Sequence, residues 1–458
     1  TDKENFEGDK SLEISSSPTN RIVFPKKQEF FNLRLNDELV LNMPAVLYAD
    51  SSGSLPAMKE NIDYSIEGKP EGFYATAKDR TSRIAITVMT WSVLNNFMIR
   101  DIPYNKMKSH LFKALKNASL AENRDEFMEV LNELLSITND SQARVWQGYE
   151  TEKYAIPVLL DIVKDTVFIS KVHESVKNIE PGDRLVSVGG KPVFAYLGEI
   201  ASGMPVSTDA FGLKRAIAMT RIGKKDSPLE VTIKKINGET FDTTLLRSMS
   251  SRELKKDRPP KIFEVEKGIA YIDITAFTDK ELKEYINSLK ETEGIIFDAR
   301  GLVETSVHLL GLFIDKPVFS VRWEIPVYTY PDKSNVSQKV VHGIIKGHNM
   351  LPDKKMIFLS NETSMGYSEA FLQLVKDYDL GEVIGRATAG MPGEIIAYRL
   401  PGDYHFSLTG MKAYSARQEL MTGNPVKPDI EVYPTIEDMK KEKDPLIEKA
   451  IEIIKSEQ

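Results

Sequence analysis

One strand–turn–helix segment constrains the fold of this chain more than any other feature. An apolar run at 356–359 is followed by 363–369, which reads Thr-Ser-Met-Gly-Tyr-Ser-Glu, and then by a helical pattern at 370–375. A strand, a tight turn and a helix in this order present a serine beside the positive end of a helix in several hydrolases. In this chain the residue at the turn is Gly366, which has no side chain.

The surrounding sequence predicts that this segment belongs to a largely parallel sheet. Strand patterns occur at 268–275, 294–301, 355–360 and 381–385, and helix-like stretches at 279–289, 306–313 and 368–377 lie between or beside them. Alternation of this kind indicates βαβ units. We therefore expect a mainly parallel α/β core over residues 260–458.

The remainder of the chain predicts a multidomain protein of mixed α/β and β segments. Residues 1–20 are polar and are expected to be a flexible tether. Short strands with turn residues predict a small N-terminal β-domain over 21–82, either a structural cap or a binding module. Apolar residues at helical spacing predict a helical segment over 83–150, with a polar helix start at 123–125.

Residues 151–250 return to strand patterns and resemble a PDZ domain. The stretch 181–193 reads Pro-Gly-Asp-Arg-Leu-Val-Ser-Val-Gly-Gly-Lys-Pro-Val, in which a turn, an alternating strand and a Gly-Gly hairpin follow one another. PDZ domains bind extended peptides by adding a strand to a sheet edge. The resemblance nominates Phe168 and Ile169, on the strand expected at 166–172, as peptide-binding residues. The alternative is that this domain only packs between its neighbours.

Composition excludes several classes of function. A chain of 458 residues is longer than one domain with a single hydrophobic core usually is. Of its residues, 41% are hydrophobic and 28% are charged. No apolar run reaches the length of a membrane helix, so we expect no integral membrane segment. A net charge of −7 and a pI near 5.7 oppose nucleic-acid binding. With no cysteine, no metal-ligand spacing of the six histidines and no phosphate-binding motif, we expect neither a metal nor a cofactor.

Several segments resemble the tail-specific (C-terminal-processing) serine peptidase family, in the branch like the tricorn protease core. They include 385–390 (Gly-Arg-Ala-Thr-Ala-Gly), 400–404, 409–412 and 427–430, and the resemblance is strongest over 298–429. The resemblance implies a serine peptidase that acts on a peptide or an unfolded protein tail. It places the nucleophile at Gly366, the base at Gln142 and the orienting acid at Thr422, so all three positions are substituted.

These substitutions remove the chemistry that the resemblance implies. An amide at Gln142 cannot take a proton near neutral pH. The lysine of the family's serine–lysine branch falls on Met391, and the glycine pair expected after Asp298 and Arg300 is missing, so these two are expected to form a structural ion pair.

The serines on either side of Gly366 are the other candidates for a nucleophile. Ser364 and Ser368 each lie two residues away from the turn position. Because a sharp turn aims only one side chain at the substrate, a shift of two residues loses the geometry. For Ser368 and Glu369 we expect helix capping and a favourable acid in the first turn.

Three functions remain open. The first is a catalytically degenerate peptidase homologue that binds extended peptides or protein tails through Met365, Gly366 and Tyr367, with Phe168 and Ile169 on the PDZ-like part. The second is an active serine peptidase with a non-standard catalytic set. The third is a structural or interaction module whose ligand is not a peptide.

The first residue and the resemblance together suggest a location. Because residue 1 is Thr rather than Met, a leader has been removed or the chain has been trimmed. A processed secretory leader or a lipid anchor lost from this chain would fit, so we expect a protein of the cell envelope or a secreted protein.

Overall fold

The structure is a computed structural model, and the chain forms two compact units. The first comprises Thr1–Lys69 with Pro326–Lys339, and the second Pro70–Ile325 with Val340–Gln458. The structure describes residues 30–34, 40–44, 48–50, 53–55, 77–148, 153–254, 258–303, 306–328, 336–351, 354–441 and 443–456.

Two short antiparallel pairs are described in the N-terminal part of the chain. β1 (Phe30–Arg34) pairs with β2 (Val40–Pro44), and β3 (Tyr48–Asp50) pairs with β4 (Gly53–Leu55). These strands agree with the β pattern expected there. Much of the β-domain expected over 21–82 lies outside the described residues.

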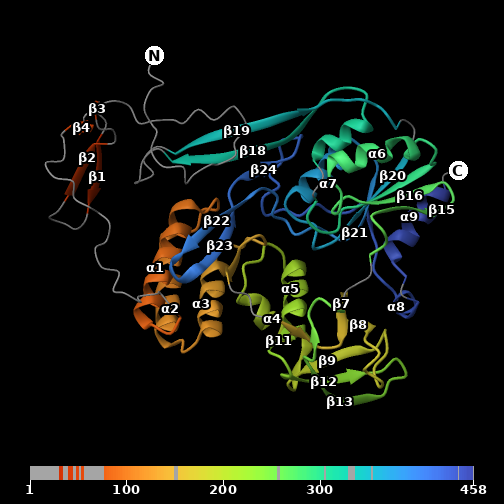
Figure 1. The fold of residues 1–458 in the computed structure, drawn as a ribbon, viewed down its shortest axis with the longest axis horizontal. Coiled ribbons are helices and arrows are strands. Elements are labelled where there is room, and N and C mark those ends of the chain that lie inside the picture. Colours follow the sequence, from red (N-terminus) through yellow and green to blue (C-terminus); the bar gives the residue numbers. More distant parts are fainter. Residues whose placement is uncertain are drawn as a thin grey trace. The chain divides into compact units, whose positions relative to one another are not determined.

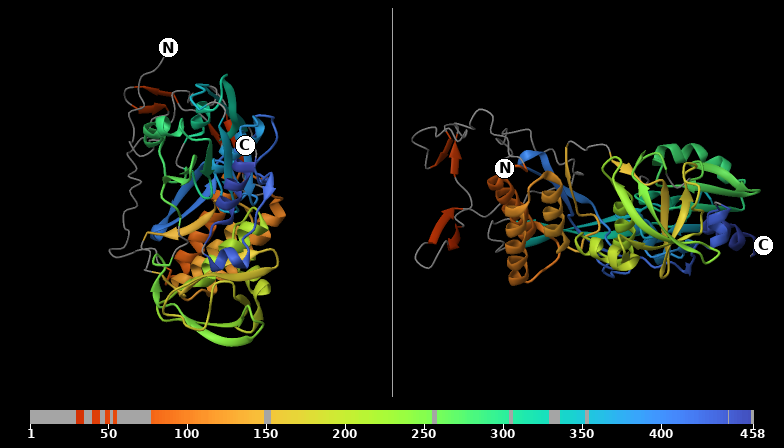
Figure 2. Two further views of the ribbon diagram at one scale, coloured as in Figure 1. Left: turned by 90° about the vertical axis from the view of Figure 1, so that its right-hand side faces the viewer. Right: turned by 90° about the horizontal axis from the view of Figure 1, so that it is seen from below.

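Three helices follow, and they pack side by side around their own core (Figure 1, Figure 2). They are α1 (Arg80–Phe97), α2 (Tyr104–Leu120) and α3 (Arg124–Ser136). Helix α3 begins where its polar start was expected, because the Asn123 side chain accepts hydrogen bonds from the amides of Asp125 and Glu126. Phe127 and Leu131 point into the shared core, which also contains Phe406.

The next region is a sheet with two helices beside it. Its strand order is β13 (Thr240–Leu246), β12 (Pro228–Lys234), β9 (Arg184–Val188), β8 (Thr166–Val172), β7 (Val158–Val163), with β10 (Lys191–Pro192) paired to β9. Gly182 adopts a φ of 97° at the expected turn, and Gly238 adopts a φ of 94° in the turn between β12 and β13. Helices α4 (Val193–Ser202) and α5 (Asp209–Arg221) contact this sheet.

The prediction that Phe168 and Ile169 bind peptide by strand addition is wrong. Both lie on β8, which has β7 on one side and β9 on the other. The amide of Ile169 donates to Asp183 and its carbonyl accepts from Gly182, so its backbone has no edge to offer. The Ile169 side chain is fully buried in the core of this region.

A second sheet forms the expected α/β core. Its order is β15 (Ile262–Glu266), β16 (Ile269–Asp273), β17 (Gly294–Asp298), β20 (Lys355–Ser360), β21 (Glu382–Gly385), β25 (Ile430–Glu431). All pairs are parallel from β16 onward, and only β15 is antiparallel. Every residue of β16 and β17 is buried, as strands covered on both faces require.

Helical elements cover this sheet. They are α6 (Asp279–Leu289), η1 (Val307–Leu312), α7 (Tyr367–Asp377) and α9 (Pro445–Ser456), whereas the short helix α8 (Ile436–Lys440) contacts β8 of the preceding sheet. Phe371 of α7 belongs to one apolar core of the sheet and Ile454 of α9 to the other. The helix expected at 306–313 is a 3₁₀ helix, and the mixed α/β class with several sheets is confirmed.

Three smaller sheets complete the described chain. The first has the strand order β11 (Ile222–Gly223), β6 (Tyr154–Ala155), β14 (Met249–Ser250). The second has the order β19 (Val336–Ile345), β18 (Val318–Tyr328), β24 (Lys412–Tyr414). The third has the order β22 (Ile395–Leu400), β23 (Tyr404–Thr409), β5 (Arg144–Gln147), and η2 (Pro401–Asp403) connects β22 to β23. The third sheet joins the end of the helical segment to a hairpin more than 240 residues later in the chain. This pairing positions Gln142.

Truncation of Phe358 tests the packing of the core sheet. Its ring stacks on Phe297 with centroids 5.1 Å apart and lies 5.9 Å from Phe371. Phe358→Ala should lower the free energy of unfolding by about 3–5 kcal/mol, measured by urea denaturation and circular dichroism. Phe112→Ala is the matched control, because Phe112 is 58% exposed, and should cost less than about 1 kcal/mol. Equal losses in the two variants would contradict the assignment of the core.

Candidate functional site

A cavity of about 650 Å³ opens beside Gly366 in the second unit. Its wall is built from three groups of residues that are distant in sequence: the segment after α3, helix α5, and the turns at the C-terminal end of the core sheet. The lining residues are Ser141, Gln142, Ala143, Arg144, Phe211, Lys214, Arg215, Ala218, Leu302, Val303, Thr363, Met365, Gly366, Tyr367, Gly393, Glu394 and Ile395. Met365, Gly366 and Tyr367 therefore lie in a cavity, as the sequence predicted for a binding surface.

Gly366 has the backbone of a strained turn between a strand and a helix. Its φ is 65° and its ψ is −125°, and it precedes the first residue of α7. Non-glycine residues adopt this conformation only at a cost of about 1–3 kcal/mol, which active sites tolerate because the surrounding structure enforces it. The sharp turn that exposes a nucleophile in other hydrolases has the same character.

Gln142 faces this turn directly. A Cβ atom placed on Gly366 would lie 3.3 Å from Oε1 of Gln142, 3.5 Å from Leu302 and 3.6 Å from the carbonyl oxygen of Gly393. The two positions that the family resemblance assigned to nucleophile and base are therefore neighbours, although 224 residues separate them. A side chain at 366 would reach the side chain at 142 without a change in the fold.

The orientation of the Gln142 amide is fixed by three acceptors. Its Nε2 donates to the carbonyl oxygens of Met391 (2.9 Å) and Gly393 (3.1 Å) and lies 3.0 Å from Oγ1 of Thr409. Because acceptors surround Nε2, the amide oxygen is the atom that must face Gly366. No donor to this oxygen is found among the described residues, so Gln142 presents an open acceptor to the cavity.

Asp140 holds the backbone of this segment. It is buried, accepts from the amides of Gln142 (2.9 Å) and Thr409 (2.6 Å), and accepts from the Thr409 hydroxyl (2.9 Å). Burial raises the pKa of Asp140, although these hydrogen bonds oppose the shift. The carboxylate ties the turn before β5 to strand β23 and thereby sets the position of Gln142.

Thr422 does not take part in the wall of the cavity. Its hydroxyl accepts a hydrogen bond from the Ala413 amide at 2.9 Å, and it is absent from the lining. The polar side chain next to Gln142 is Thr409 instead, and Asp140 lies behind it. Sequence reasoning missed this arrangement, because the contacts that join Thr409 to Gln142 and Asp140 span more than 260 positions.

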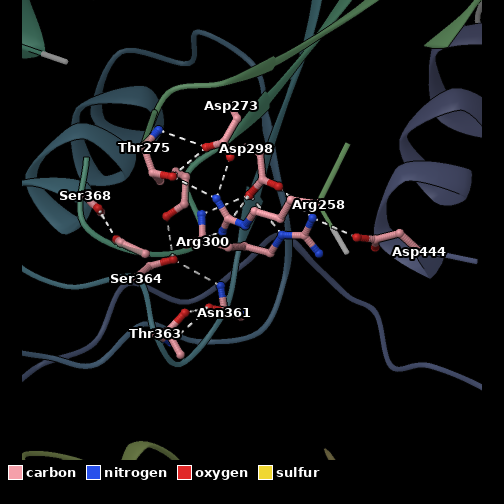
Figure 3. Close-up of polar contacts among 12 residues, drawn as sticks. Arg258, Asp273, Thr275, Asp298, Arg300, Asn361, Thr363, Ser364, Ser368 and Asp444 are labelled. Atoms are coloured by element: carbon pink, nitrogen blue, oxygen red, sulfur yellow. Dashed lines mark hydrogen bonds and ion pairs between the residues drawn. The ribbon is translucent and has the colours of Figure 1, made fainter. Parts of the chain in front are cut away.

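Ser364 and Ser368 are buried and fully engaged (Figure 3). Ser364 donates to the carbonyl of Ala299 at 2.8 Å, and Ser368 donates to the carbonyl of Gly301 at 2.5 Å. Ser368 also accepts from the Val303 amide at 2.9 Å. The prediction that Ser368 caps α7 is wrong, because Gly366 is the N-cap and makes no side-chain bond. Both serines fix the turn against the end of β17.

The end of β17 is held by a buried ion pair, as expected (Figure 3). Arg300 donates to the two carboxylate oxygens of Asp298 at 2.9 and 2.6 Å and pairs with Asp444 at 2.8 Å. Burial alone would raise the pKa of Asp298, but the Arg300 guanidinium outweighs it and lowers the pKa. Arg258 adds a bond to Asp273 at 2.7 Å. None of these five residues lines the cavity.

Glu369 is a buried carboxyl in the first turn of α7, where an acid was expected. It accepts from the Thr388 hydroxyl (2.6 Å) and from the amides of Gly390 (2.6 Å) and Met391 (2.9 Å). Burial raises its pKa to about 7, against the effect of these donors. Glu369 thus fixes the start of the segment whose carbonyls hold Gln142.

Helix α5 contributes a wall that sequence reasoning did not find. Lys214 pairs with Asp161 at 3.0 Å and with Glu362 at 3.6 Å, and Arg386 pairs with Glu362 at 2.9 Å. Arg215 donates to the carbonyls of Ala143 and Pro205. Both cations are therefore committed to the protein. The described lining residues include no histidine, and Glu394 is the only carboxylate among them.

The comparisons with known proteins agree with this geometry. Residues 268–432 match the model of peptidase family S41. The similarity to family S41 covers this segment, which is 165 of the 458 residues. This match confirms the resemblance to the tail-specific peptidases, and it supports a peptidase-like function with peptides as the substrate class. No curated protein matches the chain.

The solved structures extend the likeness to most of the chain. Mature CPAF in complex with lactacystin is 14% identical, with a TM-score of 0.66 over 82% of this chain and 98% of that one. A mutant of CPAF is 15% identical, with a TM-score of 0.66 over 82% and 97%. At these identities the likeness shows the fold alone. No helix in the described part of the chain is long and apolar enough to span a membrane.

The titration of Glu369 gives a test of the network behind the cavity. Its ordinary pKa of 4.5 rises to about 7 on folding, so the native state binds this proton more tightly. The free energy of unfolding should therefore fall as pH rises from about 4.5 to about 7, by about 3 kcal/mol for this group. Glu369→Gln cannot ionise and should lack this contribution. Urea unfolding of both proteins at several pH values measures the difference, and a difference that stays constant with pH would contradict the assignment.

Proposed function

We propose that this S41 homologue is catalytically degenerate and binds extended peptides or protein tails in the cavity beside Gly366. One observation carries the proposal. The turn keeps the backbone of a nucleophile position and lies against position 142, but it has glycine and glutamine where acyl transfer needs a hydroxyl and a base. The scaffold supports positioning of a peptide, and the reacting groups are absent from both positions.

The chemistry of the wall favours a peptide backbone. The open Gln142 oxygen can accept one hydrogen bond from a peptide N–H, and the positive end of α7 lies at the wall through Tyr367. Apolar side chains such as Phe211 and Ile395 offer contact area for a side chain of the ligand. A cavity of about 650 Å³ lies within the range of roughly 300–1,000 Å³ that is typical of ligand sites.

We further propose that residues 151–250 act as a PDZ-like domain that supports the cavity rather than as the main peptide site. One edge strand of its sheet is β7, whose carbonyls at Val158 and Ile162 already accept from Arg221 and Arg386; the other edge strand is β13. A peptide that added to the β7 edge would compete with both arginines. The roles of the 21–82 β-domain and a place in the cell envelope or outside the cell remain proposals from the sequence and the family resemblance.

An active serine peptidase with a non-standard set is the less favoured function. Ser364 and Ser368 are buried, and Ser141, which lines the cavity, is bonded to Ser207 at 2.5 Å. None of these hydroxyls has a histidine or a free amine beside it among the described contacts. A purely structural module is also less favoured, because it would need neither the cavity nor the open acceptor.

A peptide titration tests the proposal. A pool of ten-residue peptides with free carboxyl ends should bind with a Kd in the micromolar range or above, because few contacts must offset the ordering of a flexible chain. Ala218→Trp should fill the cavity from the exposed side of α5 and weaken binding at least tenfold by calorimetry. Gln142→Met should also weaken binding, because it removes the acceptor.

The matched control is Ala195→Trp. Ala195 is likewise exposed and helical, on α4, but it lines no part of this cavity. It should leave the Kd within about twofold of that of the unaltered chain. If saturating peptide gives no heat, or if both tryptophan variants lose binding equally, the cavity is not the peptide site and a structural role becomes the better account.

A further inference from the structure

A second cavity lies on the other side of the helical segment. It also measures about 650 Å³ and shares no lining residue with the cavity beside Gly366. Helices α2 and α3 form one wall, and α4 with Met219 of α5 forms the other. The lining residues are Asn117, Leu120, Ala121, Glu126, Glu129, Val130, Asn132, Glu133, Glu199, Ile200, Gly203, Met204 and Met219. We call this cavity the helical groove.

The helical groove combines an apolar floor with carboxylates. Leu120 is 65% exposed and Met219 is 44% exposed, and Val130, Ile200 and Met204 continue the apolar surface inward. Exposed large apolar side chains that line a hollow indicate a partner rather than a solvated surface. Methionine suits such a surface because its unbranched, polarizable side chain adapts to different contacts.

The four carboxylates are not equally neutralised. Glu133 pairs with Lys113, and Glu199 pairs with Lys191 at 2.6 Å. Glu126 lies on the next turn of α3 and accepts from the amide of Glu122 (2.8 Å) and from Asn123 (2.6 Å), but it pairs with no cation among the described residues. Two negative charges on neighbouring turns, Glu126 and Glu129, therefore remain for a ligand.

Of the four carboxylates, Glu129 contributes least to the internal contacts of the protein. No hydrogen bond or ion pair to its carboxylate is found in the described part of the chain. Burial raises its pKa, and the carboxylates of Glu126 and Asp125 add to the shift. The electrostatic potential around the Glu129 carboxylate is thus negative, and no ion pair in the described part of the chain offsets it, which favours binding of a cation beside it.

We propose that the helical groove binds a basic amphipathic segment of a partner protein. Its apolar face would lie on Leu120, Val130 and Met219, and a Lys or Arg one turn away would pair with Glu129 and Glu126. Helices that carry apolar residues at i, i+3 and i+4 bind grooves in this manner. Charge complementarity at the rim then selects basic over acidic partners.

The chain itself does not supply this segment from residues 1–20. That stretch contains five acidic residues, Asp2, Glu4, Glu7, Asp9 and Glu13, against the two lysines Lys3 and Lys10. Its charge has the same sign as the rim of the groove, so electrostatics opposes this occupant. A second copy of the chain, which has a net charge of −7, is disfavoured for the same reason.

The test uses a fluorescent 14-residue peptide with leucines at helical spacing and lysines on the other face. Anisotropy should show saturable binding to the full chain, and a twin with the lysines replaced by glutamates should not bind. A scrambled twin of equal charge but without an apolar face should bind at least tenfold more weakly. Absence of binding by the basic peptide, or equal binding of the scrambled twin, would overturn the proposal.

Variants locate the site. Glu129→Gln should weaken binding several-fold and Glu129→Lys more than tenfold, and because Glu129 holds no other part of the protein neither should lower stability in a thermal melt. Met219→Ala should weaken binding through lost apolar contact. Glu230→Gln is the matched control, an exposed glutamate on β12 that changes the net charge equally. Equal losses in Glu129→Gln and Glu230→Gln would mean that the peptide senses only overall charge, and the groove would be rejected as the site.

Discussion

The buried ion pair between Asp298 and Arg300 is the interaction on which the position of Gly366 depends. A carboxylate with no solvent exposure needs a partner, and Arg300 supplies two hydrogen bonds to it while Tyr271 supplies a third at 2.7 Å. The pair fixes the chain as it leaves β17. The carbonyls of Ala299 and Gly301 then accept from Ser364 and Ser368, and these two bonds set the turn between them.

The opposite wall is fixed by a second buried carboxyl. Glu369 binds the amides of Gly390 and Met391, and the carbonyls of Met391 and Gly393 in turn hold the amide of Gln142. The positions of both walls of the cavity therefore depend on buried carboxyl groups behind them, Asp298 on one side and Glu369 on the other. In the resembled family the histidine of this wall accepts a proton, whereas here the amide nitrogen is committed to the protein and the oxygen is left for a ligand. Under the proposed function, the cavity positions a peptide although an amide at residue 142 cannot accept a proton from a nucleophile.

The sequence predicted the elements whose signal is local. Strands 166–172 and 355–360 and helix 279–289 have the predicted bounds, because apolar period and turn residues are enough to define them. It also predicted that Gln142 and Gly366 would meet, through motifs that resemble a family. The S41 match covers 268–432, so for Gln142 the proximity in space is independent support.

Long-range relations were not predictable from such patterns. Strand order decides which strand lies at an edge, and β8 proved to be interior, which removed Phe168 and Ile169 as binding residues. Ser368 matches a capping pattern, but its side chain donates to the carbonyl of Gly301, and Glu369, which lies in the first turn as expected, also accepts from the distant amide of Gly390. No local sequence pattern shows that α5 forms a wall of the cavity or that Thr409 lies beside Gln142. Each arrangement depends on segments that are far apart in the chain.

The central claim is that this S41 scaffold has no working nucleophile, and fluorophosphonate labelling with peptide mapping by mass spectrometry tests it most directly. The account predicts no labelled serine in the folded chain under conditions that label an active serine peptidase completely. Loss of the hydroxyl at 366 and of the base at 142 is the physical reason. Stoichiometric labelling of Ser364, Ser368 or Ser141 in the folded protein would contradict the account and would identify an active enzyme.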